Sequence, residues 1–136
     1  MEGISTFNQS RLQLIVLVVA FVLFVVSIML GVLSGISYGK SLATYHGVDT
    51  INQALQYYKK DQGVYPTPTQ FSDDQILRLL YIDTMPVPAD VTGSCSNYKD
   101  FQYTQTTRND FTLQFCLLQA VNGWAAGVNH LSNPAN

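Results

Sequence analysis

The sequence predicts an α+β protein in which one long N-terminal helix packs on a small antiparallel sheet of about three strands. An uncharged run from Leu14 to Leu33 is followed by apolar residues at helical spacing, and alternating apolar and polar residues fill the last third of the chain. Helices repeat every 3.6 residues and strands every two, so the change of period marks a change of element. We expect four segments: a polar tail over 1–11, a membrane-spanning helix over 12–36, its amphipathic continuation over 37–62 and a globular head over 63–136.

The apolar run of residues 12–36 is long enough to cross a bilayer. A hydrocarbon core of about 30 Å requires about 20 apolar residues at a rise of 1.5 Å each. A secretory signal has a shorter apolar core of about 7–15 residues before a small-residue cleavage site, which fits neither the length nor the flank of this run. The sequence therefore predicts a single-pass membrane protein.

The two cysteines, Cys95 and Cys116, both follow the apolar run, so they are expected on one side of the membrane. In an oxidising compartment a bridge between them would contribute about 3 kcal/mol by restricting the unfolded chain. Two free buried thiols are the alternative. Because Arg11 and Lys40 flank the run at its two ends, the charge rule says little about orientation. The cysteines and the short N-terminal tail favour the N-terminus inside and the head outside.

The segment 37–62 has one apolar helical face, which is expected to dock the sheet. Spacings of three and four residues place its members on one side of a helix. These are Val48, Ile51, Leu55 and Tyr58. Lys59 and Lys60 followed by Gly63 predict the end of the helix, because cations favour its last turn and glycine tolerates the left-handed cap.

Three glycines, Gly31, Gly35 and Gly39, stand four residues apart near the end of the apolar run. They share one helical face, and small residues let a second helix approach closely in a membrane. We interpret this face as a helix-packing surface in an assembly. The alternative is that these glycines mark the end of a membrane helix or a softened segment.

After a loop, the head is predicted to form a short helix over residues 73–81. Ser72 and Gln75 stand three apart, as in a capping box, before an apolar stretch. Asp73 and Asp74 suit the positive end of a helix, so we assign them a structural role rather than a catalytic one. Prolines beyond this helix predict an extended loop.

Alternating residues then predict a β-hairpin over 101–118 with its turn at "TRND". A second turn at Asn122 and Gly123 leads into a third strand over 124–131. A sheet of three strands needs a helix to cover its apolar face, and the amphipathic segment 37–62 is the natural cover.

The chain offers no arrangement expected of an enzyme or a nucleic-acid-binding protein. Its formal charge is −2 and it has no basic run that could displace counterions from phosphates. His46 and His130 are far apart in sequence and lack acidic neighbours at metal-ligand spacing. A thiol–histidine nucleophile can be drawn with Cys95, but a second cysteine favours the disulfide. We therefore expect no catalysis and no cofactor.

Calcium is the one metal for which the sequence offers ligands. Asp83, Asp90 and Asp100 lie in a loop-rich stretch, where carboxylates and carbonyls could hold this ion. Their spacing differs from that of a helix–loop–helix calcium site.

The apolar helix, its continuation "INQALQYYKKDQGVYPT", and the later segments "FQYTQTTRNDFTLQFCLL" and "AAGVNHLS" together resemble the type IV pilins and the pseudopilins of type II secretion. The most specific part runs from Ala54 to Thr67. The resemblance implies a structural subunit that packs with like or related subunits through its N-terminal helix, in the membrane or in a cell-surface filament.

The N-terminus departs from this family's pattern. Members usually carry a basic leader ending in glycine, which a peptidase removes, and a glutamate at the fifth position of the mature chain. Gly3 is the candidate leader end here, Glu2 precedes it, and Asn8 occupies that fifth position. The family's glutamate is implied to offset a neighbouring N-terminal amine, so its loss makes long filaments less certain.

A second interpretation is a membrane-anchored binding module that never polymerises. Aromatic residues are enriched at interfaces, and exposed aromatic side chains of the head would supply the contacts. The candidates are Tyr57, Tyr65, Tyr98, Tyr103 and Trp124. The same residues could instead fill the small core.

Overall fold

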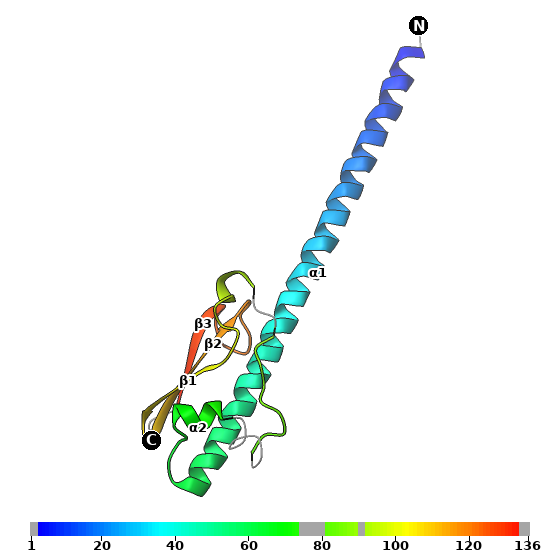
Figure 1. Ribbon diagram of the computed structural model, residues 1–136. Helices are drawn as coiled ribbons and strands as arrows, with labels where there is room; N and C mark the ends of the chain where they lie inside the picture. The colour runs from blue at the N-terminus through cyan, green and yellow to red at the C-terminus, as the bar shows by residue number, and fades with distance from the viewer. Residues whose placement is uncertain (1–2, 74–80, 90–91, 134–136) are drawn as a thin grey trace. The chain divides into compact units, whose positions relative to one another are not determined.

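The computed structural model describes residues 3–73, 81–89 and 92–133, with side chains from Arg11 onward (Figure 1). It has the predicted α+β layout. Its elements are the helices α1 (Gly3–Gln62) and α2 (Pro68–Ser72), the 3₁₀ turn η1 (Gly93–Cys95), and the strands β1 (Gln102–Thr107), β2 (Asp110–Leu117) and β3 (Gly127–Ser132). The chain divides into two compact units, residues 1–36 and residues 37–136. We call the second the folded unit; it contains the amphipathic part of α1 and the head.

Helix α1 begins at Gly3, ahead of the membrane helix predicted over 12–36. Residues 3–11, for which a polar tail and a lead-in to the helix were both open, are helical and lead directly into the apolar run. They contain no proline, and extending an existing helix adds one hydrogen bond for each residue fixed, so the helix continues through them. Its other end is as predicted: Gly63 has φ 76° and its N–H donates to the Lys59 carbonyl at 2.8 Å. This left-handed residue ends the helix.

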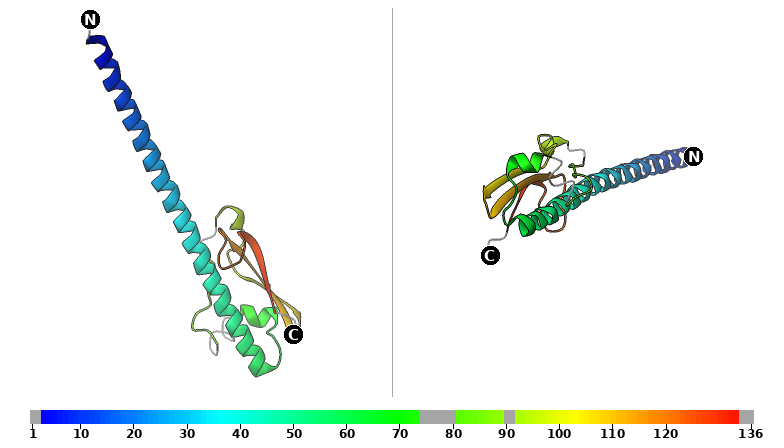
Figure 2. Two further views of the ribbon diagram at one scale, coloured as in Figure 1. Left: turned by 180° about the vertical axis from the view of Figure 1, so that it is seen from behind. Right: turned by 60° about the horizontal axis from the view of Figure 1, so that its bottom comes forward.

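The three strands form one antiparallel sheet in the order β1-β2-β3, beside the part of α1 that belongs to the folded unit (Figures 1 and 2). The predicted hairpin is confirmed, with Tyr103 opposite Leu113. Strand β3 begins at Gly127 rather than at Trp124. The reason is the turn at Asn122 and Gly123, which Val121 and Trp124 close with two backbone hydrogen bonds, so that Trp124 belongs to the turn.

The core of the folded unit lies between α1 and the inner face of the sheet. All four residues of the predicted docking face are buried there. So are the alternating residues of β2, namely Phe111, Leu113, Phe115 and Leu117. Burying one such side chain contributes about 1.5–3 kcal/mol, so these contacts hold the sheet on the helix.

Helix α2 occupies a stretch that the sequence analysis assigned to a loop. Thr67 accepts a hydrogen bond from the Gln70 N–H and Gln70 reaches back to the Thr67 N–H, which makes a capping box with proline following the cap. Ser72, the predicted cap of the next helix, is the last residue of α2, and its hydroxyl donates to the Thr69 carbonyl. Most of the predicted helix, residues 74–80, lies outside the described residues, and Tyr81 is in a turn.

The Cys95–Cys116 disulfide is present, and both cysteines are buried. Cys116 points to the opposite face of the sheet from its neighbours Phe115 and Leu117, because side chains alternate along a strand. The bridge therefore fastens η1 over that outer face. This explains why the burial pattern of β2 stops alternating at its end.

Candidate functional site

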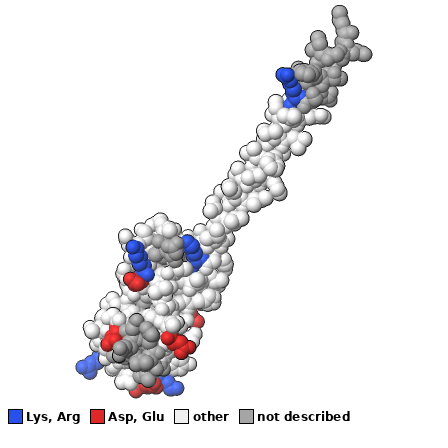
Figure 3. Space-filling view, turned by 45° about the vertical axis from the view of Figure 1, so that its right-hand side comes forward, with Lys and Arg blue, Asp and Glu red and all other residues white. Residues whose placement is uncertain are grey.

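The apolar run is the largest exposed apolar surface in the described part of the chain. Its large apolar side chains between Leu12 and Ile36 are 38–71% exposed. Figure 3 shows neither blue nor red atoms along the visible face of this run. Soluble proteins rarely expose such a large continuous apolar surface. The helix that carries the run is long and apolar enough to cross a membrane.

The glycine face of the run is open within a single chain. A Cβ added at Gly31, Gly35 or Gly39 would meet nothing within 4 Å outside the nearby backbone of the helix itself. Gly47 differs, since an added Cβ would lie 3.0 Å from the Phe101 ring and 3.1 Å from Pro86. Gly47 thus serves the packing of the folded unit, whereas packing within one chain does not use the other three glycines. The use of Gly31, Gly35 and Gly39 in assembly stays a prediction.

Two polar residues on the buried side of α1 were missed by the sequence analysis. Ser41 accepts a hydrogen bond from the Gln119 N–H at 2.9 Å, and Thr44 accepts one from the Ala89 N–H at 3.1 Å. Both side chains are buried. Thr44 lies four residues before Val48 and Ser41 lies three before Thr44, so both continue the docking face toward the apolar run, which was the available signal.

Tyr65 and Tyr103 are both held by hydrogen bonds within the folded unit. Tyr65 is 1% exposed, and its hydroxyl donates to Gln56 at 3.1 Å. The half-buried Tyr103 donates to the Pro66 carbonyl at 2.7 Å. Burial is the main cause that raises the pKa of both phenols above 10.0. They remain protonated donors at neutral pH.

The other aromatic candidates differ in exposure. The half-buried Trp124 packs its ring edge-on against Phe115, with the two ring centroids 5.3 Å apart. Tyr98 is also half-buried. Tyr57, which is 58% exposed, is the one fully exposed member of the predicted set. Four of the five aromatic residues are therefore buried or half-buried, as the core interpretation expects, because a small core recruits most of its large side chains; Tyr57 alone of the five is exposed.

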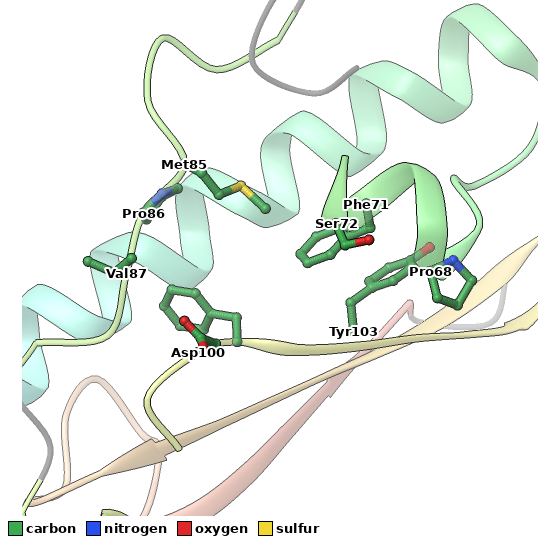
Figure 4. Close-up of a pocket in the computed structure, with 9 residues that line it drawn as sticks. Pro68, Phe71, Ser72, Met85, Pro86, Val87, Asp100 and Tyr103 are labelled. Carbon is green, nitrogen blue, oxygen red and sulfur yellow. The ribbon is translucent and has the colours of Figure 1, made fainter. Parts of the chain in front are cut away.

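A cavity of about 530 Å³ lies within the folded unit between α2, the loop of residues 85–87 and the start of β1 (Figure 4). We call it the head groove. In Figure 4 the rings of Phe71 and Tyr103 stand side by side, with their centroids 4.3 Å apart. Its lining residues are Pro68, Phe71, Ser72, Met85, Pro86, Val87, Asp100, Phe101 and Tyr103. Among the described residues of this lining, Asp100 is the one charged side chain, and it also lines a neighbouring hollow together with Lys99.

The described residues contain no cluster of three His, Cys, Asp or Glu side chains that could hold a metal. Of the calcium candidates, Asp83 and Asp100 are exposed and Asp90 lies outside the described residues. His46 and His130 are both exposed. Gly3 is the first residue of α1, and cleavage after it stays a prediction.

The sequence matches no protein-family model, and no curated protein or solved structure matches the chain.

Proposed function

We propose that this protein is a structural subunit of a pilin-like or pseudopilin-like assembly that packs through its apolar N-terminal helix. The observation that carries the proposal is the combination of an exposed apolar run with a separately packed folded unit. Hydrocarbon or neighbouring helices can cover such a run without disturbing the core of the folded unit. The α+β layout and the helix end at Gly63 agree with what the resemblance to pilins and pseudopilins implies.

The membrane location proposed is single-pass, with the N-terminus inside and the folded unit outside. The Cys95–Cys116 bridge supports this orientation, because disulfides persist mainly in oxidising compartments. Assembly is assigned to the open glycine face, where Gly31 and Gly35 would let a second helix approach closely. A cell-surface filament is one form that such an assembly could take.

The experiment that tests the proposal is amine-reactive cross-linking of native membranes and of sheared surface material, followed by intact mass measurement. We expect a ladder of multimers containing this chain. Reduction should raise the subunit mass by two hydrogen atoms, as the disulfide requires. A subunit mass beginning at Ile4 in sheared material would identify a processed filament subunit. A chain recovered only as a monomer from every fraction would contradict the proposal.

The second candidate is a membrane-anchored binding module that remains monomeric. The head groove favours it, since its volume lies in the range of about 300–1,000 Å³ usual for small-molecule sites. The same cross-linking experiment separates the two candidates, because a binding module gives no ladder in which this chain contacts its own copies.

A further inference from the structure

The folded unit begins almost directly where the apolar run ends. Arg11 and Lys40 are the charged residues nearest to the run on its two sides. The helix between them rises about 44 Å at 1.5 Å per residue, and a bilayer with both headgroup regions measures about 40–45 Å. Tyr38, which is 46% exposed, precedes Lys40, and tyrosine is enriched at membrane–water interfaces. The interface is therefore expected at residues 37–40, the first residues of the folded unit.

A loop of the folded unit is held close to this level of the helix. Ser41 accepts a hydrogen bond from the N–H of Gln119, which belongs to the segment 118–126 between β2 and β3. We call this segment the β2–β3 loop. Ser41 follows Ile36, the end of the run, by five residues, which is about 7.5 Å of helix rise. A headgroup region is about 5–8 Å thick, so the loop is within reach of the headgroups.

The β2–β3 loop has the composition of a segment that lies at a membrane interface. It contains no Asp, Glu, Lys or Arg, and Ala120, Ala125 and Ala126 are exposed. Its half-buried Trp124 is of the residue type most typical of the interface, where one side of the ring is apolar and the N–H is wet. Val128, at the start of β3, is 45% exposed. The loop thus presents uncharged, largely apolar surface.

The opposite end of the folded unit is charged. The Lys59 ammonium donates to the Asn109 carbonyl at 3.3 Å, which brings the end of α1 to the turn between β1 and β2. That end carries Lys59, Lys60, Asp61, Arg108 and Asp110. At the end of the β2–β3 loop, where β1 starts and β2 finishes, Lys99 and Asp100 add one charge of each sign. The two ends therefore differ in polarity along α1.

We propose that the β2–β3 loop rests on the headgroup layer of the bilayer that the run crosses, with Trp124 at the interface. This inference rests on the membrane location in the proposed function and names a lipid surface as the partner of this end of the folded unit. Contact would remove apolar loop surface from water, and an uncharged loop avoids the cost of dehydrating an ion. Lipid is favoured over a second copy, because the run brings each copy to the bilayer.

The single tryptophan provides a direct test in the full chain. The protein is reconstituted in phosphatidylcholine vesicles whose lipids carry a nitroxide quencher either on the headgroup or deep in the acyl chain. We expect the headgroup nitroxide to quench Trp124 fluorescence severalfold more than the deep nitroxide does. The same measurement on two relocated tryptophans, both in a Trp124→Phe background, provides the controls. Thr106→Trp, at an exposed position of β1 near the charged end, should be quenched by neither lipid.

The second relocated tryptophan, Val25→Trp, lies in the middle of the run and reports the membrane span itself. The deep nitroxide should quench it most. A seven-residue helical insert of Gln and Ala after Ile36 supplies a further variant, since it raises the folded unit by about 10 Å and nearly preserves its facing. The insert should abolish headgroup quenching of Trp124 while leaving the urea unfolding transition unchanged. Quenching that survives the insert would contradict contact with the bilayer.

Two further results would overturn the inference. Absence of Trp124 quenching by headgroup nitroxide, with Val25→Trp quenched by the deep nitroxide, would hold the folded unit away from lipid and leave the proposed function standing. Headgroup quenching of Trp124 that is lost at high protein density would show that a second copy covers the loop in the assembly. Absence of deep quenching of Val25→Trp would instead overturn the membrane span in the proposed function.

Discussion

The apolar run and the folded unit are both rich in apolar residues but use them in opposite ways. Phe24 in the run is 64% exposed, whereas Phe115 in β2 is fully buried. The folded unit buries its apolar side chains within the chain, whereas the large apolar side chains of the run stay exposed. Apolar content alone therefore does not define a core. The spacing of apolar residues and the presence of strands to cover them decide which part folds on itself and which part requires a membrane or another helix.

Replacing one phenylalanine by alanine in each of the two regions should give the largest difference in the free energy of unfolding. Phe115→Ala removes a buried ring and should lower the free energy of unfolding by about 3–5 kcal/mol. Phe24→Ala should leave that free energy unchanged, because Phe24 is not part of the core. Urea denaturation of the full chain in nonionic detergent, monitored by the fluorescence of the single tryptophan, measures the free energy of unfolding of both variants. Equal losses would contradict the division into two units.

A charge should harm membrane insertion only in the apolar run. Leu23→Arg places an ion near the centre of the run and should disfavour insertion by about 3 kcal/mol. Val87→Arg, at an exposed position of the folded unit, is the matched control. Carbonate extraction of membranes measures the retained fraction of each variant. If Leu23→Arg is retained as well as the control, the run does not cross the bilayer.

Two glycines extend the comparison to close packing. Gly47→Leu must push against Phe101 and Pro86, so it should lower the stability of the folded unit by about 1–3 kcal/mol. At Gly35 an added Cβ has open space around it and the residue is exposed, so Gly35→Leu should not change that stability. It should instead reduce helix cross-linking in membranes. If Gly35→Leu lowered the stability of the folded unit, Gly35 would take part in the packing of that unit, and the comparison between the two glycines would be contradicted.

The folded unit should also lose stability in alkali, an effect with no counterpart in the apolar run. Burial, with smaller contributions from Tyr65 and Tyr58, raises the pKa of Tyr103 above 10.0. The folded state therefore keeps its proton at a pH where the unfolded chain releases it, so stability is intact below pH 10 and falls as the pH rises above 10. Denaturation at several pH values measures this fall.

Tyr103→Phe provides the control for the alkaline effect. It should weaken the fall above pH 10, because the phenol that resists ionisation is gone. At neutral pH it should cost about 1 kcal/mol, the net contribution of a typical hydrogen bond, since the bond to Pro66 is lost. An unchanged alkaline fall would assign the effect to other tyrosines, of which the buried Tyr65 is the first candidate.

Periodicity was sufficient to predict most of the architecture. The helix end at Gly63, the hairpin and the turn at Asn122 and Gly123 follow from local chemistry that the three-dimensional fold retains. The start of β3 and the position of α2 were missed because neighbouring signals compete. Thr67 and Gln70 have the same spacing as Ser72 and Gln75, and the sequence analysis assigned the helix start to the second pair.

The surfaces were harder to predict than the elements. Tyr57 and Tyr65 are both named as candidate contact residues from the sequence, yet one is exposed and the other buried, because the chain after α1 folds Tyr65 back against Phe111 with ring centroids 4.7 Å apart. The head groove likewise combines residues from α2, the 85–87 loop and β1. Such combinations depend on long-range packing, which a single sequence does not display.

A cysteine scan along the apolar run in native membranes tests the central claim most directly. Single cysteines at Gly31, Val32, Leu33, Ser34 and Gly35 would be oxidised, and the yield of disulfide dimers measured; the native cysteines are paired and buried. The account predicts high yields at Gly31 and Gly35 and severalfold lower yields at Leu33, since residues four apart share a helix face. Uniformly low yields at all five positions would contradict assembly through this helix.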